Sequence, residues 1–166
     1  PLLFYYHLIV VHPVLDAPAR FWAPSMRAEP ANDQARADAD WAACGGPAAG
    51  YMERQYYHEM AADARGETVA ALVNEELELG VYLRYNARSL PKIAQWKVLR
   101  EGEYVHAFEP GNCHPIGREA LRARGELEVL PPMQARGAEL EIGIVDTAAE
   151  IEDLRREIAD LVAAVK

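Results

Sequence analysis

Apolar and polar residues alternate with a period of two over much of the middle of the chain, which is the pattern of β-strands. The alternation is clearest in residues 80–85 (GVYLRY). Glu101-Gly102 is a turn pair between two such runs, and Gly66 is typical of a hairpin between two others. Strands at roughly ten-residue spacing indicate an antiparallel sandwich or barrel. We expect strands over residues 51–60, 68–77, 79–88, 93–100, 104–108 and 138–145.

The N-terminal third departs from this alternation. Residues 2–11 (LLFYYHLIVV) are aromatic and β-branched, so we expect a buried strand that ends before Pro13. Residues 17–50 are rich in Pro, Gly, Ala and Asp, which predicts an irregular excursion with a helical turn at 33–42. Long connections of this kind often cover a functional site.

Two helices are expected in the C-terminal third. Residues 115–125 begin at Pro115 and end at Gly125, which is typical of a short helix. Thr147 and Glu150 form a capping box, because each can bond to a backbone N–H near the other. Apolar residues then recur at spacings of three and four, and such a stripe packs on its own domain or, alternatively, makes a short coiled-coil contact. The stripe comprises Ile151, Leu154, Ile158, Leu161 and Val165.

Composition narrows the classes of function. The net charge is -9 and no block of Lys and Arg offsets it, which argues against nucleic acid and anionic membranes as partners. The apolar run at 2–11 is too short to span a membrane and lacks the basic start of a signal peptide. Cys44 and Cys113 make no disulfide framework, so we expect a cytoplasmic location. The apolar start at Pro1 suggests a piece whose N-terminal neighbour is absent.

Glu109 is a candidate general base. It ends an apolar strand and precedes Pro110, so the backbone holds it firmly. Burial there raises the pKa of a carboxyl, as a general base near neutral pH requires. The alternative is structural: Glu109 pairs with Arg118 or caps the helix after Pro115.

His7 lies midway along the apolar segment 2–11. It is either a core residue whose hydrogen bond Tyr5 or Tyr6 satisfies, or a general acid or base, because imidazole titrates near neutrality. A metal site is a third possibility, but no HExxH or CxxC spacing is present, so we expect no metal. Such a site would draw on His7, His12, His58, Cys113 and His114, with Glu53 or Glu59.

The first sixteen residues, PLLFYYHLIVVHPVLD, resemble the segment of galactose mutarotase-like proteins that carries a catalytic histidine. Within that superfamily the chain is similar to the DUF4432 branch of aldose 1-epimerase-like proteins. The resemblance extends over residues 1–16 and 50–146. Its matching residues are Pro1, Leu2, Tyr6, His7, Pro13, Leu15, Asp16, Leu90-Pro91, Trp96-Lys97, residues 104–113 (YVHAFEPGNC), Gly117-Arg118 and Leu130-Pro131-Pro132.

The resemblance implies a mainly β fold. This is an antiparallel β-sandwich of the galactose mutarotase-like supersandwich type, here partial, with a short helix and a C-terminal helix. We expect the sugar-binding sandwich over residues 1–146 and the amphipathic helix over 147–166. Because chains of the family are longer, we expect either a homodimer or dependence on an N-terminal portion.

The resemblance also implies an activity: an aldose 1-epimerase interconverts the α and β anomers of a monosaccharide or sugar derivative without metal or organic cofactor. Glu109 would take the proton of the C1 hydroxyl and His7 would protonate the ring oxygen, so that the ring opens and recloses. Substrate contacts would come from Trp96, Lys97, His58 and Asn112.

Two departures from the family pattern keep other functions open. Ile9 and Val11 stand where the branch carries Asn and Gly, which removes a polar contact and narrows the approach. These changes favour a carbohydrate-binding module that lacks turnover. A structural or assembly subunit, with the helix at 147–165 as its contact, is the remaining alternative.

Overall fold

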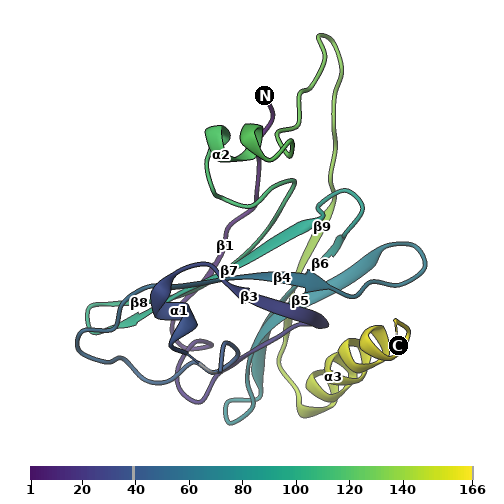
Figure 1. Cartoon of the computed structure of the whole chain (residues 1–166). Helices are drawn as coiled ribbons and strands as arrows, with labels where there is room; N and C mark the ends of the chain where they lie inside the picture. Colours follow the sequence, from purple (N-terminus) through teal and green to yellow (C-terminus); the bar gives the residue numbers. More distant parts are fainter. Residues whose placement is uncertain (39, 166) are drawn as a thin grey trace.

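The computed structural model describes residues 1–38 and 40–165, which form two antiparallel sheets packed face to face (Figure 1). The five-stranded sheet, called the large sheet, has the order β1-β8-β7-β4-β3, and the four-stranded small sheet has the order β2-β5-β6-β9. The elements are β1 (Leu8–Val10), β2 (Arg20–Trp22), β3 (Ser25–Pro30), α1 (Asp33–Arg36), β4 (Arg54–Met60), β5 (Glu67–Asn74), β6 (Leu79–Asn86), β7 (Lys92–Arg100), β8 (Glu103–Gly111), α2 (Arg118–Ala123), β9 (Leu140–Val145) and α3 (Ala148–Ala163). The expected mainly β sandwich is confirmed.

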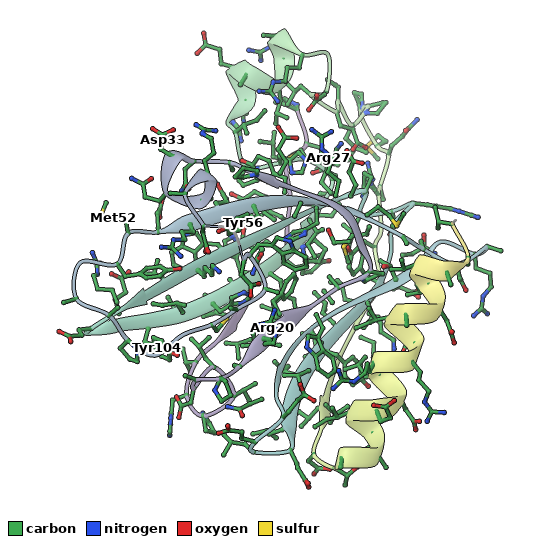
Figure 2. The ribbon with its side chains drawn as sticks, turned by 60° about the horizontal axis from the view of Figure 1, so that its bottom comes forward. Arg20, Arg27, Asp33, Met52, Tyr56 and Tyr104 are labelled. Carbon is green, nitrogen blue, oxygen red and sulfur yellow. The ribbon has the colours of Figure 1, made fainter. Side chains whose placement is uncertain are left out.

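The core lies between the two sheets, where side chains fill the space that the ribbons leave (Figure 2). Phe21 of β2 meets Phe108 of β8 with a ring-centroid distance of 5.5 Å. Leu72 and Leu83 of the small sheet and Ile93 of the large sheet are buried in the same cluster. Burial of these apolar side chains is the main force that holds the sheets together.

The large sheet has an inner face toward the small sheet and an outer face away from it. Partners in an antiparallel register point to the same side, and successive residues point to opposite sides. Lys97 of β7 pairs with His106 of β8 on the inner face. Ala94 pairs with Glu109 on the outer face. Functional groups on one strand are thereby divided between the core and the surface.

The expected C-terminal helix is confirmed, and it packs on the face of the small sheet that is turned away from the core. Thr147 accepts a hydrogen bond from the backbone N–H of Glu150, and the Glu150 carboxylate accepts one from the N–H of Asp146. Ile151 and Leu154 are buried against apolar side chains of β5. The apolar stripe thus serves its own domain, and the predicted helix start is the residue that the capping box marks.

Three details of the sequence prediction are wrong. The expected excursion at 17–50 contains two strands, β2 and β3, each of which extends a sheet edge. Gly66 does not form a hairpin between two paired strands, because β4 and β5 belong to different sheets. The expected strand 2–11 is regular only at β1, although Tyr5 forms an isolated bridge with Gly111. The helical turn at 33–42 is present as α1.

Residues 124–139 connect α2 with β9 and are largely exposed. This connection runs beside the start of the chain, where the N–H of Leu2 donates to the carbonyl of Glu128 over 2.8 Å (Figure 1). Arg136 pairs with the Glu128 carboxylate and donates to the carbonyl of Ser89 over 2.6 Å. The connection is therefore held to the rest of the chain at Glu128, by a backbone hydrogen bond, and at Arg136, by a side-chain hydrogen bond.

Candidate active site

One row of side chains crosses the outer face of the large sheet from strand to strand. Glu109 of β8 lies opposite Ala94 of β7, Ala94 lies opposite Tyr57 of β4, and Tyr57 lies opposite Glu29 of β3. His7, directly before β1, completes the row at the other end. Ala94, with its small side chain, lies between Glu109 and Tyr57 in this row.

His7 and Glu109 touch. Nδ1 of His7 lies 3.0 Å from Oε1 of Glu109. The side chain of His7 is 47% exposed, whereas that of Glu109 is 5% exposed. Burial raises the pKa of the Glu109 carboxyl above its ordinary value, and a positive charge on His7 acts in the opposite direction. The pair thus combines a carboxyl that is easily protonated with an imidazole that solvent and a ligand can reach.

The contact excludes an arrangement in which one pyranose ring lies between the two groups. A separation of 3.0 Å leaves no room between them. A ligand must therefore lie against the pair from the solvent side or replace the contact. Both groups point to the same face, which an acid and a base acting on one small molecule require.

Trp96 lies in the neighbouring row of the same face. It pairs with Ala107 of β8 and Gln55 of β4, and this row lies two residues along each strand from the row of Glu109. Its indole N–H donates to the carboxylate of Glu53 over 3.1 Å. The indole is partly exposed, so it can present a flat apolar surface to a ligand at the outer face.

A polar cleft opens beside the pair, and sequence reasoning did not find it. Its volume is about 220 Å³, and Tyr57, Lys92, His114 and Arg124 line it together with acidic residues of β3 and β4. The rings of Tyr57 and His114 stack at a centroid distance of 4.0 Å. Burial lowers the pKa of His114 to about 4, so its imidazole is neutral near pH 7.

No signal in the sequence joins Tyr57 to His114, because they come from β4 and from the segment before α2. The charge of Glu109 contributes to a raised pKa of Tyr57, after the larger effect of burial and against the lowering effect of Arg124. In the register of the sheet, Ala94 of β7 lies between Tyr57 and Glu109, so the Tyr57 end of the cleft is turned toward the acid–base pair.

Lys97 and His58 do not share the outer face with the pair. Lys97 is 1% exposed, and its ammonium lies 3.1 Å from Asp38 and donates to the carbonyls of Trp41 and Ala43, each over 3.0 Å. His58 is 4% exposed. The expected sugar contacts of these two residues are therefore unsupported by their placement, and both act within the core.

A chain of hydrogen bonds links the buried polar residues of the inner face. Nδ1 of His58 lies 2.9 Å from the hydroxyl of Ser25, and its Nε2 lies 3.1 Å from Oε1 of Gln95. The amide of Gln95 donates to Nε2 of His106 over 2.9 Å and to the carbonyl of Trp41. Burial lowers the pKa of His58 to about 4 and that of His106 to about 3, so both stay neutral.

Asn112 fastens the segment that carries His7. Its side-chain oxygen accepts the N–H of Phe4 over 3.0 Å, and its amide donates to the carbonyl of Leu2 over 3.0 Å and to Glu128 over 2.9 Å. Both N–H groups of the amide are thus used within the protein, and its oxygen accepts one hydrogen bond. Asn112 positions the N-terminal segment beside the end of β8, and the structure does not place it among the outer-face groups around Glu109.

Among the described residues, no three His, Cys, Asp or Glu side chains gather closely enough to hold a metal ion. The helices within the described ranges are all too short or too polar to cross a membrane.

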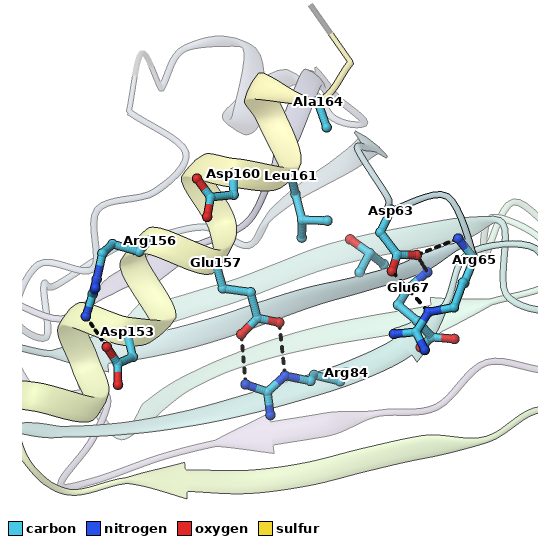
Figure 3. A pocket seen from close by; sticks show the side chains of 11 residues that line it. Asp63, Arg65, Glu67, Arg84, Asp153, Arg156, Glu157, Asp160, Leu161 and Ala164 are labelled. Carbon is cyan, nitrogen blue, oxygen red and sulfur yellow. Dashed lines mark hydrogen bonds and ion pairs between the residues drawn. The ribbon is translucent and has the colours of Figure 1, made fainter.

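A separate groove lies between α3 and the small sheet, away from the pair (Figure 3). Its volume is about 890 Å³. Arg84 of β6 crosses its floor and donates two hydrogen bonds to Glu157 of α3, over 3.1 and 2.8 Å. Arg156 pairs with Asp153 at its rim. The Arg84–Glu157 pair thus holds the helix to the sheet, whereas the Arg156–Asp153 pair lies within the helix.

The two packed antiparallel sheets form the mainly β sandwich that is expected of a mutarotase-like protein. The chain belongs to the family described as "Domain of unknown function (DUF4432)", whose model matches residues 1–144. The match ends before α3 begins. No curated protein matches the sequence.

A solved structure supports the relationship. The chain is similar to a protein from Klebsiella pneumoniae subsp. pneumoniae MGH 78578 that is provisionally named an aldose 1-epimerase, with a TM-score of 0.91 and 26% sequence identity. The similarity covers 95% of this chain and 42% of that chain. The chain thus has a mutarotase-like fold and spans less than half the length of that protein.

Proposed function

We propose that the chain acts in an aldose 1-epimerase-like isomerase, in which Glu109 and His7 interconvert the α and β anomers of a monosaccharide. The observation that carries the proposal is the 3.0 Å contact between the imidazole and the carboxyl on the outer face of the large sheet. The family fold and the similarity to the Klebsiella protein support this class of reaction.

The proposed reaction needs one base and one acid. The Glu109 carboxylate accepts the proton of the C1 hydroxyl while protonated His7 donates its proton to the ring oxygen. The bond between C1 and the ring oxygen breaks as the C1 carbonyl forms, which gives the open-chain aldehyde. Rotation about the C1–C2 bond and the reverse proton transfers close the ring as the other anomer, and both residues return to their starting states.

A pair in mutual contact suits this reaction. The C1 hydroxyl and the ring oxygen are bonded to the same carbon, so both lie within reach of two groups that stand side by side. Burial raises the pKa of Glu109, which makes the carboxylate a stronger base than an exposed one. The exposed ring of His7 can turn from the carboxylate to the ligand.

The cleft at Tyr57 and His114 is the proposed binding site for the rest of the sugar. Its volume of about 220 Å³ lies below the roughly 300–1,000 Å³ of sites for drug-sized ligands, so it suits a small molecule. Lining groups of both charges supply hydrogen-bond donors and acceptors for sugar hydroxyls. Trp96, on the same face, supplies a ring on which the apolar side of a pyranose can stack.

Anomer exchange tests the proposal directly. Freshly dissolved α-D-glucose and α-D-galactose are followed by polarimetry and by saturation-transfer NMR, with and without the protein. We expect the native chain to accelerate exchange and the Glu109→Gln variant to lose at least about 100-fold of that acceleration, because general acid–base groups contribute 10²–10⁴-fold. Glu101→Gln, at an exposed position in the turn between β7 and β8, is the matched control and should keep the rate.

The outcomes separate the alternatives. An unchanged rate in Glu109→Gln would exclude the general base. Sugar binding detected by titration without any exchange would instead identify a carbohydrate-binding module. Activity that falls as pH decreases through the raised pKa of Glu109, and that loses this dependence in the glutamine variant, would assign the acidic limb to this carboxyl.

A further inference from the structure

The polar cleft beside the acid–base pair contains two cationic side chains without a counterion among the described residues. Lys92 is the first residue of β7, and Arg124 directly follows α2. Both line the cleft, yet neither forms an ion pair or a side-chain hydrogen bond within the described ranges. Burial is the largest cause of the lowered pKa of His114, and the charges of Lys92 and Arg124 lower that pKa further. The two charges therefore converge on one part of the cleft.

The carboxylates of the cleft belong mainly to its β3 side. Arg27 of β3 lies 3.7 Å from Glu29 of the same strand and 3.6 Å from Glu59 of β4. Glu126 is exposed and forms no ion pair with either cation of the preceding paragraph among the described residues. The β3 side is thus occupied by charges that contact one another, whereas the side formed by β7 and the end of α2 can receive an external anion.

Lys92 lies about one sugar length from the acid–base pair. Ala94, which is opposite Glu109, is two residues along β7 from Lys92, so all three point to the outer face. One strand across and two residues along amount to a displacement of roughly 8 Å between Glu109 and Lys92. This span suits a pyranose whose C1 lies at Glu109 and whose C6 substituent extends into the cleft.

The opposite direction along the strands is apolar. The next row of the outer face places Ile9 opposite Ala107 and Ala107 opposite Trp96. Ile9 is 55% exposed, so an apolar surface borders the pair on this side. A charged substituent placed there would lose hydration without gaining a cationic partner. The contrast between the two sides orients a bound sugar with its charged end at Lys92.

We propose that the cleft binds an anionic substituent of the sugar, a phosphate or a carboxylate at C6, through Lys92 and Arg124. This inference deepens the proposed function and rests on it for the position of C1. Ammonium and guanidinium groups form charge-assisted hydrogen bonds with phosphate and carboxylate oxygens, and these are stronger than hydrogen bonds with neutral hydroxyls. The site therefore prefers a hexose 6-phosphate or a hexuronate to a neutral aldose.

Titration calorimetry with D-glucose 6-phosphate, D-glucuronate and D-glucose tests the proposal. We expect at least one of the two anionic sugars to bind at least about 10-fold more tightly than glucose, because charge-assisted hydrogen bonds contribute more than neutral ones. The chain carries a net charge of -9, so general attraction does not favour an anion. Tighter binding of the phosphate alone would assign a phosphate site, and tighter binding of glucuronate alone would assign a carboxylate site.

Variants locate the anion within the molecule. Lys92→Met and Arg124→Gln should each reduce the preference for the anionic sugar over glucose by at least about 5-fold. Neither residue is buried, so an unfolding midpoint within about 2 °C of the native value is expected for both variants. Arg122→Gln is the matched control, because it removes the same charge from an exposed position of α2 and should keep the preference. Equal losses in all three variants would overturn the assigned contacts.

The anion site and the isomerase can fail separately. An anion preference without anomer exchange would keep the site and contradict the proposed reaction. Accelerated exchange of glucose without an anion preference would keep the reaction and contradict the site. Binding of both anionic sugars that is equal to or weaker than that of glucose, or binding of none of the three, would likewise overturn the inference.

Discussion

The two faces of the large sheet carry similar residue types, but these residues are buried on the inner face and partly open to solvent on the outer face. The inner face holds His58, His106 and Lys97, and each is buried with at least one hydrogen-bond partner. The outer face holds His7 against Glu109, with the imidazole open to solvent. Histidine and a charged partner are present on both faces, so residue type alone does not separate a structural group from a chemical one.

Two properties separate the groups of the inner face from the pair on the outer face: access to solvent and the number of hydrogen-bond partners. The Lys97 ammonium contacts Asp38 and three backbone carbonyls, so its charge is compensated within the fold. The Glu109 carboxyl is buried with a single charged neighbour, and its raised pKa shows that ionisation there costs free energy. Removing an inner-face group should therefore destabilise the protein, whereas neutralising Glu109 should not.

The largest effect is expected for Lys97→Met. This change leaves Asp38 with one fewer cation and three carbonyls without their donor, so we expect a loss of about 4 kcal/mol in the free energy of unfolding. Lys92→Met is the matched control, because Lys92 lies on the same strand at the outer face. It should change the free energy by less than about 0.5 kcal/mol. Equal losses in the two variants, measured by urea unfolding, would contradict the distinction between the faces.

The second-largest effect is expected at acid pH, where protonation of the buried histidines should lower the stability of the protein. The pKa values of His58 and His106 are lowered to about 4 and about 3, while histidine in an unfolded chain has a pKa of about 6.5. The unfolded chain therefore binds more protons below about pH 6.5, and stability falls as the pH decreases toward these values. We expect a loss of about 3 kcal/mol between pH 7 and pH 5.

Variants assign this pH dependence. His106→Gln should remove about a third of the loss, because the pKa values of His58 and His114 are lowered as well. His12→Gln should leave the loss unchanged, because the side chain of His12 is 78% exposed. Urea unfolding followed at several pH values supplies the measurement. A stability that is flat from pH 7 to pH 5 would mean that the two buried histidines do not resist protonation.

A smaller effect is expected for Asn112→Ala, which detaches the segment of His7 from the outer face. The variant loses three hydrogen bonds, and we expect the free energy of unfolding to fall by about 2 kcal/mol. Exchange of the Phe4 and Tyr6 amide protons should accelerate first, because their segment loses its anchor. Unaltered exchange at both amides would show that Asn112 does not hold this segment.

The smallest effect, and one of opposite sign, is expected for Glu109→Gln. A carboxyl whose pKa is raised in the folded state gives up stability as the pH rises through that pKa, and glutamine cannot ionise. The variant should therefore be more stable than the native chain at pH 7, by less than about 1 kcal/mol, and equal to it near pH 4. A clear loss of stability at pH 7 would mean that the ion pair with His7 outweighs the cost of burial.

The sequence predicted the regular parts of the fold because their signals are local. The capping box at Thr147 and the alternation in β6 depend on residues close together in the chain, and both predictions are confirmed. The strands β2 and β3 were missed because three to six residues inside a proline-rich segment carry little pattern. Their order in the sheets depends on distant contacts that no local spacing reveals.

The site was predicted less completely. The resemblance to the family brought His7 and Glu109 together, and the structure places them in contact. Trp96 and Lys97 could not both contact one sugar, because adjacent residues of a strand point to opposite faces of the sheet. Alternation could not say which of the two faces the core, and a fully buried lysine is rare enough to go unexpected. Tyr57 and His114 meet only through tertiary packing.

We expect the fold to tolerate a break in the chain within the exposed connection at 124–139. Exposed segments of this kind are where proteases cut first. After a cut near Met133, β9 would keep its full register with β6, and α3 would keep its apolar contacts and the Arg84–Glu157 pair. The connection is thus a suitable position for new termini in a circular permutant, which would leave the outer-face pair on an uninterrupted large sheet.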